Sequence, residues 1–352
     1  MKQLVKQSKK NIFKLGNIIP ILLLCVLIII ILNPTKYSSV ALTGLEVWVK
    51  VLVPSLFPFF VLTKLFSASG FIDDFTKLFA PTSKKLYKCP PVSTYIFLMS
   101  IITGYPVGAK LVADFYNSGN LSKTDAIKTL SFSANSGPMF ILGSVAIGMF
   151  TSKKLGLIIY ISHILGALIN GLVYRNYGNF ILKKQKNNTS KNKTDLTQKQ
   201  MQIPNSAQMH TLAQKNSINF VESINSSISS IMLIGGVICF TFVLIEVITS
   251  SAIFKGIINA ISGIGINSNL LSALFSGIFE ITKGCLMISS IPLSFNLVAM
   301  LCTFIISFGG ISTLLQAIAF TKNIVPTKIF FLQKITHSLC ATLVCALILI
   351  FV

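Results

Sequence analysis

Nine apolar stretches, separated by short polar or basic segments, account for most of the chain. They cover residues 18–32, 44–66, 95–112, 130–150, 155–174, 220–248, 270–291, 293–320 and 329–352. A helix needs about 20 mainly apolar residues to cross the hydrocarbon core of a bilayer, and most of these stretches reach or approach that length. The pattern therefore predicts an all-α, polytopic integral membrane protein with about eight or nine apolar segments.

Four of these stretches are interrupted by glycine, proline and polar residues, which suit a lipid-facing helix poorly. Such residues free backbone N–H and C=O groups that lipid cannot satisfy, so a broken backbone at membrane depth has to be covered by protein or line a wet cavity. We expect the following residues to shape these breaks: Gly104, Tyr105, Pro106, Gly108, Pro138, Gly284, Gly309 and Gly310.

The order of segments repeats on either side of a polar stretch rich in Lys, Asn, Gln and Ser, which is too polar to fold alone. When Gly108 is aligned with Gly284, the breaks of the two halves fall opposite each other, as in transporters with a binding site at the bilayer midplane. The chain divides into a basic segment with a first transmembrane helix (1–43), a first membrane repeat (44–175), a polar cytoplasmic linker (176–217) and a second membrane repeat (218–352).

Lysine placement tests the topology, because cytoplasmic loops of membrane proteins carry an excess of Lys and Arg. If every apolar stretch crosses fully, the linker with its seven lysines falls outside the cell. If residues 95–128 and 270–292 are instead re-entrant hairpins that enter from opposite faces, only six of the 30 Lys and Arg lie outside. This second arrangement is an inverted repeat with two re-entrant or broken helical hairpins and a cytoplasmic N-terminus. It fits the charge better than full crossing, which is the alternative.

Composition and charge exclude several classes of protein. Only 11% of the residues are charged, against about a quarter in a soluble domain. The net charge of +21 comes without a basic helix or an aromatic RNA-binding pattern, so we expect no nucleic-acid partner. The seven cysteines show no zinc or disulfide spacing and the three histidines lie far apart, so we expect no metal and no cofactor. No activated nucleophile or clustered His, Asp and Glu set indicates an enzyme.

The breaks also carry the side chains that we expect to contact a solute. Ionisable groups deep in a membrane usually face a partner or a wet cavity. Glu280 and Lys283 therefore either coordinate a solute or pair with each other at i and i+3. Asn135 either presents a polar group to the solute or belongs to a kink that neighbouring helices satisfy. The candidate site residues are Asn135, Ser136, Gly137, Glu280, Thr282, Lys283, Ser312 and Gln316.

Four further ionisable side chains stand apart from the candidate site in the sequence. Glu46, Glu246 and His337 are isolated, and we expect each to be interfacial or locally satisfied rather than to carry protons. His163 lies in a span near Ser162, where a helix–helix hydrogen bond is the expected role.

Three of the breaks carry a family resemblance. Residues 104–110 (Gly-Tyr-Pro-Val-Gly-Ala-Lys), 133–138 (Ser-Ala-Asn-Ser-Gly-Pro) and 279–284 (Phe-Glu-Ile-Thr-Lys-Gly) resemble sporulation integral membrane proteins of the YlbJ type. The resemblance covers most of the chain from about residue 42 onward. It implies a nucleoside-recognition, or Gate, domain related in architecture to nucleoside permeases, and a place in the cell membrane of an endospore-forming bacterium. The chain has no GTPase domain, so it does not resemble a whole ferrous-iron transporter.

We therefore expect a sporulation protein that binds or moves a small polar solute, with one repeat moving against the other. Its partners would be the lipid bilayer, a small polar solute or coupling ion, and other sporulation membrane proteins or a second copy of the chain. The alternative is a non-transporting scaffold or signalling protein for spore envelope or cortex assembly. A membrane enzyme acting on a lipid-linked peptidoglycan precursor is the least supported, because the catalytic set is missing.

Overall fold

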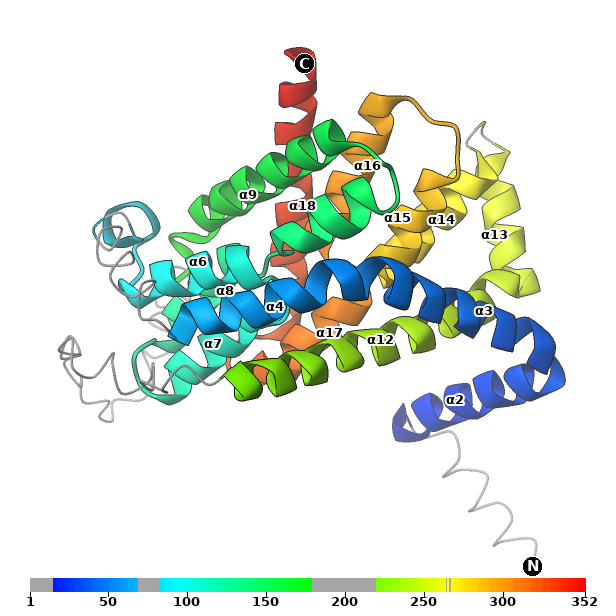
Figure 1. Cartoon of the computed structure of the whole chain (residues 1–352), viewed down its shortest axis with the longest axis horizontal. Coiled ribbons are helices and arrows are strands. Elements are labelled where there is room, and N and C mark those ends of the chain that lie inside the picture. The colour runs from blue at the N-terminus through cyan, green and yellow to red at the C-terminus, as the bar shows by residue number, and fades with distance from the viewer. Residues whose placement is uncertain (1–14, 69–80, 82, 179–219, 264, 266) are drawn as a thin grey trace, which may run out of the picture.

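The computed structural model describes residues 15–352 except 69–80, 82, 179–219, 264 and 266, and the described residues form helices without any strand (Figure 1). This confirms the all-α prediction for that part of the chain. The basic residues 1–14 and nearly all of the predicted linker (176–217) lie outside the described residues. The described α-helices are α2 (Leu15–Leu32), α3 (Pro34–Val47), α4 (Val53–Ala68), α6 (Val92–Thr103), α7 (Val107–Asn117), α8 (Lys123–Ser133), α9 (Lys153–Tyr174), α12 (Phe220–Ser250), α13 (Ala252–Ser262), α14 (Ser268–Phe279), α15 (Ile281–Ser289), α16 (Phe295–Phe308), α17 (Gly310–Thr321) and α18 (Thr327–Ile350). Three π-helical segments complete the order: η1 (Trp48–Leu52), η2 (Ser83–Tyr87) and η3 (Met139–Ile147).

Four helical stretches are long and apolar enough to cross a membrane, namely α9, α12, the consecutive pair α16 and α17, and α18. A fifth span results if α2 and the following helix are counted together, although they meet at 104°. This bend falls at Asn33–Pro34, where proline starts the new helix. The described residues therefore hold four or five full-length candidate spans, and the expected eight or nine segments are not confirmed. Residues 95–112 and 270–291 are each divided between two helices of 9 to 12 residues, which are too short to cross alone.

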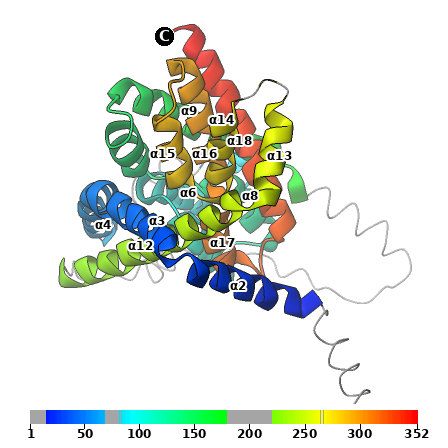
Figure 2. The same cartoon turned by 90° about the vertical axis from the view of Figure 1, so that its right-hand side faces the viewer.

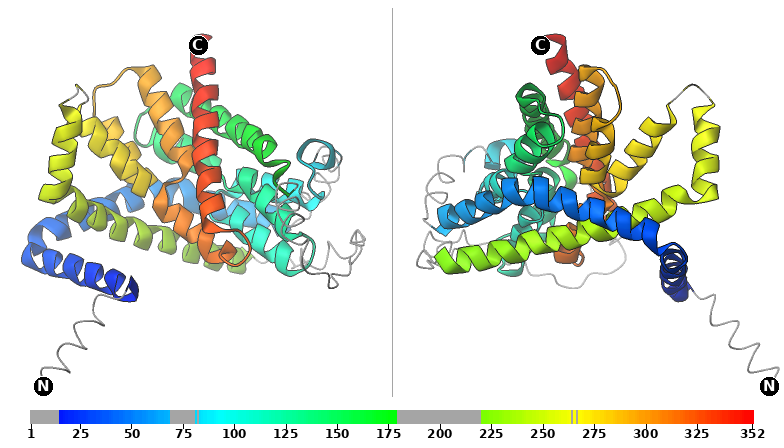
Figure 3. Two further views of the ribbon diagram at one scale, coloured as in Figure 1. Left: turned by 180° about the vertical axis from the view of Figure 1, so that it is seen from behind. Right: turned by 45° about the vertical axis from the view of Figure 1, so that its right-hand side comes forward.

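A long antiparallel helix pair forms one side of the molecule. The segment η1 joins α3 to α4, and the resulting long helix lies alongside α12 (Figures 1 and 3). Close approach depends on Gly235 of α12, because a Cβ there would lie 2.5 Å from the ring of Trp48. The Trp48 indole Nε1–H donates to the carbonyl oxygen of Ile231 at 3.0 Å. This hydrogen bond and the packed ring fix the register of the two helices.

The helices α9, α16 and α18 pack on one another beside this pair (Figure 2). Gly166 of α9 faces Ala341 of α18, and a Cβ on the glycine would come within 2.5 Å of the alanine Cα. Small residues at such crossings let the backbones approach and permit interhelical hydrogen bonds. Asn170 of α9 uses this proximity, because its amide donates to the carbonyl oxygens of Ser131 at 2.6 Å and Gln333 at 3.0 Å. A buried polar side chain thus joins three elements.

Four elements are interrupted where the sequence places glycine, proline or glutamate. The first hairpin breaks between α6 and α7 at residues 104–106, and the second between α14 and α15 at Glu280. The helix α8 ends at Ser133, and η3 follows after residues 134–138. The helix α16 ends before Gly309, whose φ of 93° is left-handed backbone that favours glycine.

Candidate functional site

The interrupted elements pack directly against each other, backbone to backbone, in each half of the chain. Gly104 has a φ of 76°, and a Cβ there would lie 2.5 Å from the backbone nitrogen of Gly137. In the second half, a Cβ on Gly310 would lie 3.3 Å from the backbone nitrogen of Ile281. The hydroxyl of Tyr105 reaches across to the second half, where it would lie 2.8 Å from a Cβ on Gly309. All four breaks therefore meet at one place.

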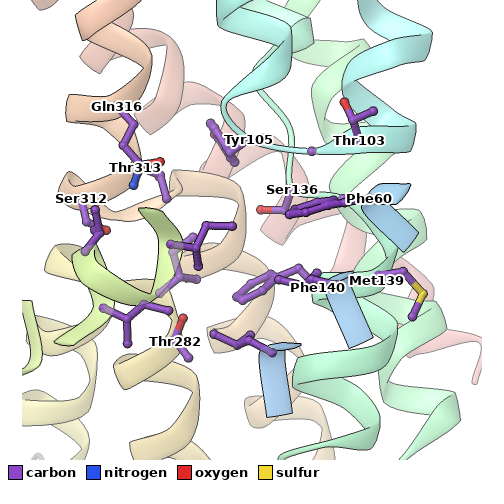
Figure 4. Close-up of a pocket in the computed structure, with 18 of the residues that line it drawn as sticks. Phe60, Thr103, Tyr105, Ser136, Met139, Phe140, Thr282, Ser312, Thr313 and Gln316 are labelled. Carbon is purple, nitrogen blue, oxygen red and sulfur yellow. The ribbon is translucent and has the colours of Figure 1, made fainter. Parts of the chain in front are cut away.

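A cavity of about 90 Å³ opens at this meeting point (Figure 4). A single water needs about 10–15 Å³ of such volume, so the cavity has room for several waters or a small solute. Its polar side chains come from the breaks and from the helices beside them; they are Thr103, Tyr105, Ser136, Glu280, Thr282, Ser312, Thr313 and Gln316. Gly104 and Gly137 line it through their backbones.

The long helix pair supplies the apolar wall of the cavity. Phe60 of α4 and Ile238 of α12 line this side, and Phe140 of η3 joins them. In Figure 4, Tyr105 and Ser136 lie between the α17 side chains on one side and Phe60 on the other. The cavity thus has one polar and one apolar side, as do most sites that bind small molecules.

Two buried hydroxyls of the cavity wall, Tyr105 Oη and Ser136 Oγ, have no hydrogen-bond partner among the described residues. Buried polar atoms are nearly always hydrogen-bonded, to protein or to ordered water. A polar solute or water in the cavity would satisfy both groups, because the two side chains line it.

Glu280 is the charged side chain of the cavity lining, and it is 4% exposed. It caps α15: its Oε2 accepts from the backbone N–H of Lys283 at 2.7 Å and its Oε1 from the Thr282 hydroxyl at 3.0 Å. A negative charge at a helix N-terminus is favoured by the helix dipole. A carboxylate offers about four acceptor positions, so Glu280 can also accept a hydrogen bond from a solute.

Lys283, three residues after Glu280, does not form with it the i, i+3 ion pair that the sequence allows. Lys283 instead lies 3.7 Å from the carboxylate of Glu246 on α12 and donates to the carbonyl oxygen of Phe242 at 3.1 Å. Glu246 also pairs with Lys36 at 3.0 Å. Glu246 is therefore not isolated: it joins α3, α12 and α15, which is a structural role outside the cavity lining.

Asn135 likewise turns away from the cavity. Its amide nitrogen donates to the Ser100 hydroxyl at 3.0 Å and to the carbonyl oxygen of Phe132 at 2.8 Å. The side chain therefore fastens the break to α6 and satisfies one carbonyl at the end of α8, which corresponds to the kink alternative for this residue.

Gly108 and Gly284 also lie outside the cavity lining, and both serve close packing. A Cβ on Gly108 would overlap the carbonyl oxygen of Ser133, at 1.8 Å. A Cβ on Gly284 would lie 2.2 Å from the Cα of Gly277, inside the second hairpin. Pro106 follows a cis peptide bond and starts α7, and Pro138 starts η3.

Two residues that the sequence analysis did not place at the site hold the break between α8 and η3, residues 134–138, which is called the first break below. The Nε2 of His163 accepts the backbone N–H of Ser136 at 3.0 Å, and the ammonium of Lys334 donates to the carbonyl oxygen of Ala134 at 2.8 Å. His163 does bond between helices, as expected, because its Nδ1 lies 2.9 Å from the Ser307 hydroxyl of α16. His337 is not isolated, since its Nδ1 lies 3.1 Å from Lys334. The signal for Lys334 was a lysine within the apolar stretch 329–352.

Among the described residues, no group of three His, Cys, Asp or Glu side chains is arranged to hold a metal ion. The polar side of the cavity consists of hydroxyls, one carboxylate, one amide and glycine backbone at helix ends.

Fold and site together define an all-helical integral membrane protein with a small, partly polar cavity where four helix breaks meet. The chain is similar to the sporulation integral membrane protein YlbJ of Bacillus subtilis (strain 168), with 29% identity over 322 residues that cover 89% of this chain and 77% of that protein. This similarity supports a YlbJ-type, sporulation-related membrane protein of an endospore former. No protein-family model matches the chain, and no solved structure matches it.

Proposed function

We propose that the protein binds and moves a small polar solute across a membrane during spore formation. The observation that carries this proposal is the cavity where the four breaks meet, with the unpaired Tyr105 and Ser136 hydroxyls in its wall. Transporters place their sites at such interrupted helices, because freed backbone groups and helix ends can then contact the solute.

The order of elements supports an inverted repeat of the Gate type. Each half contains, in order, a long helix, a broken hairpin, a broken helix and a second long helix. In the first half these are α4, α6/α7, α8/η3 and α9; in the second half they are α12, α14/α15, α16/α17 and α18. The ends of α6 at Thr103 and of α14 at Phe279 are as far apart in the sequence as Gly108 and Gly284. With the lysine distribution, this supports two hairpins that enter the membrane from opposite faces.

Alternating access follows from this arrangement. Each half contributes a hairpin and a broken helix to the cavity, and the two halves touch there through Tyr105 and Gly309. A movement of one repeat against the other would open the cavity first to one side of the membrane and then to the other. Solute recognition would come from Glu280, Gln316 and the hydroxyls, because these groups can each exchange hydrogen bonds with a polar molecule.

A flux screen tests the proposal. The full-length protein is reconstituted into vesicles, and a panel of labelled small polar metabolites is tested for uptake and for ligand-induced thermal stabilisation. We expect at least one solute to move, and Ser136→Ala to slow its uptake. The matched control is Ser290→Ala, since Ser290 is exposed at the end of α15 and outside the cavity lining. Absence of both uptake and stabilisation for the whole panel would contradict the proposal.

A non-transporting scaffold is the second candidate, and the helix α2 favours it. Leu22, Leu23, Leu24 and Leu27 of α2 are each more than half exposed, so the helix is available to other membrane proteins as well as to lipid. Variants separate the two functions in sporulating cells. If Ser136→Ala and Gln316→Ala leave spore formation intact while replacement of the α2 leucines by alanine abolishes it, the scaffold is favoured.

A further inference from the structure

Three nitrogen bases form a buried cluster behind the first break. The ammonium of Lys334 lies 3.1 Å from the Nδ1 of His337, and the rings of His337 and His163 have their centroids 4.8 Å apart. The three side chains are at most 2% exposed. None of them lines the cavity, but Lys334 also lies 5.1 Å from the centre of the Tyr105 ring, which does.

Hydrogen-bond partners assign the protons on both rings. The backbone N–H of Ser136 can only donate, so the Nε2 of His163 accepts and carries no proton; its Nδ1–H then donates to the Ser307 hydroxyl. The carbonyl oxygen of His163 can only accept, so the Nε2 of His337 carries a proton and donates to it at 3.1 Å. The Nδ1 of His337 is then free to accept from Lys334. Both rings are neutral in this arrangement.

No carboxylate neutralises the cluster in the part of the chain that the structure describes. Lys334 and His337 of α18 are the charged or titratable groups that face His163, and Tyr105 faces Lys334. The helix α16 presents Ser307, η3 contains no titratable side chain, and on α8 the carboxylate of Asp125 pairs with Lys128. Glu280 lies at the cavity, where its carboxylate accepts the backbone N–H of Lys283 at the start of α15. A buried cationic cluster without a counter-charge is costly in a membrane and is typical of functional sites.

We propose that Lys334, His337 and His163 form a proton-binding site that couples solute movement to proton movement, an inference that rests on the function proposed above. A proton that binds His163 takes the lone pair of its Nε2, and the Ser136 N–H then loses its acceptor. The break has to change conformation, because a buried N–H without a partner is unfavourable. Ser136 lines the cavity, so the proton and the solute act on the same segment.

Electrostatics limits the cluster to one excess proton at a time. A charge on Lys334 or His337 opposes a second charge on His163, because like charges this close in a buried site disfavour each other. The three groups therefore titrate as a unit. In the described state, the proton lies on the Lys334–His337 pair and His163 holds the break; in the alternative state, His163 is protonated and the break is released. The proton comes from water on one side and returns to water on the other, so no further reactant is needed.

Nitrogen NMR tests the proton site directly, because the chain has only three histidines. In protein labelled with ¹⁵N-histidine, we expect a neutral Nδ1–H ring for His163 and a neutral Nε2–H ring for His337, assigned with H163Q and H337Q. We expect Lys334→Met to shift the pH at which both rings change state. Lys328→Met on the exposed part of the same helix should leave that pH unchanged. If neither ring responds to Lys334→Met, the shared site is contradicted.

Proton movement tests the coupling. Vesicles that contain the full-length protein and a trapped pH-sensitive dye are exposed to the metabolite panel of the flux screen. We expect uptake of a solute to change the internal pH, and H163Q, which keeps a hydrogen-bonding side chain but cannot be protonated, to remove that change while some uptake persists. Solute uptake without proton movement in the unmodified protein would overturn the proton-coupling inference and leave the proposed function standing. Absence of both uptake and stabilisation for every solute would overturn the proposed function, and the titration of the two rings would then test the proton site by itself.

Discussion

The backbone N–H of Ser136 donates to the Nε2 of His163 at 3.0 Å, so a side chain of α9 satisfies a backbone group in the break between α8 and η3. The carbonyl oxygen of Ala134, two residues earlier, accepts from Lys334 of a third helix at 2.8 Å. These two bonds satisfy a backbone N–H and a backbone carbonyl oxygen that the break leaves without helical partners, and lipid offers no partner for either. The first break is therefore held as one unit by α9 and α18.

Gly104→Ala should destabilise the protein. The left-handed backbone at residue 104, with a φ of 76°, costs about 1–3 kcal/mol for a residue with a side chain. The new Cβ would also lie 2.5 Å from the backbone of Gly137, which cannot retreat as a flexible side chain can. Thermal unfolding in detergent measures the change. Gly256→Ala in α13 is the control, because no atom beyond the adjacent backbone of its own helix lies within 4 Å of its Cβ position. An unchanged melting temperature for Gly104→Ala would contradict the packing of the two breaks.

The neighbours Gly235 and Gly236 should respond differently to alanine. A Cβ on Gly235 meets the Trp48 ring at 2.5 Å, whereas a Cβ on Gly236 meets nothing within 4 Å. Overpacking of this kind costs about 1–3 kcal/mol. Because Trp48 is the only tryptophan, its fluorescence reports the contact directly. We expect Gly235→Ala to change the emission spectrum and lower the melting temperature. An identical response from Gly236→Ala would argue against the packing of Trp48, in η1, on α12.

Glu280→Ala should weaken the start of α15 and the solute site together. Loss of an N-cap side chain typically costs about 0.5–2 kcal/mol. The matched acidic residue is Glu46, whose side chain is 50% exposed and pairs with Lys50 on the surface. Exposed pairs of this kind contribute only about 0.3–0.5 kcal/mol, so Glu46→Ala should have a small effect. Thermal unfolding and solute uptake are measured for both variants. Equal losses of stability would contradict the capping role of Glu280.

Asn170→Ala should destabilise the packing of α8, α9 and α18. The Asn170 amide is fully buried, donates to two carbonyl oxygens and accepts from the Thr336 hydroxyl at 2.6 Å. Each buried group that loses its partner costs about 1–3 kcal/mol. Asn269→Ala on the exposed start of α14 is the control. A melting temperature for Asn170→Ala that equals the control would show that these bonds contribute nothing to stability.

The local sequence determined the apolar segments and the places where they break. Gly104 with Pro106, the Gly309–Gly310 pair and Glu280 each suit a continuous lipid-facing helix poorly, and each lies at a helix break in the structure. The polar character of the site could be predicted for the same reason, since Ser136, Glu280 and Gln316 lie at or beside these breaks and do line the cavity.

Only the tertiary structure decided which side chains face the cavity and which hold it in place. Asn135 and Lys283 are as polar as their neighbours, yet both turn away from the cavity, because other helices hold them. Asn135, in the break after α8, bonds to Ser100 of α6, and Lys283 of α15 pairs with Glu246 of α12. The partners of the first break come from far along the chain: Lys334 is 200 residues from Ala134. No spacing rule connects residues so far apart, because their distance is set by how α8, α9 and α18 pack. The sequence by itself therefore determined where the backbone breaks, and packing decided what satisfies each break and what remains open to a solute.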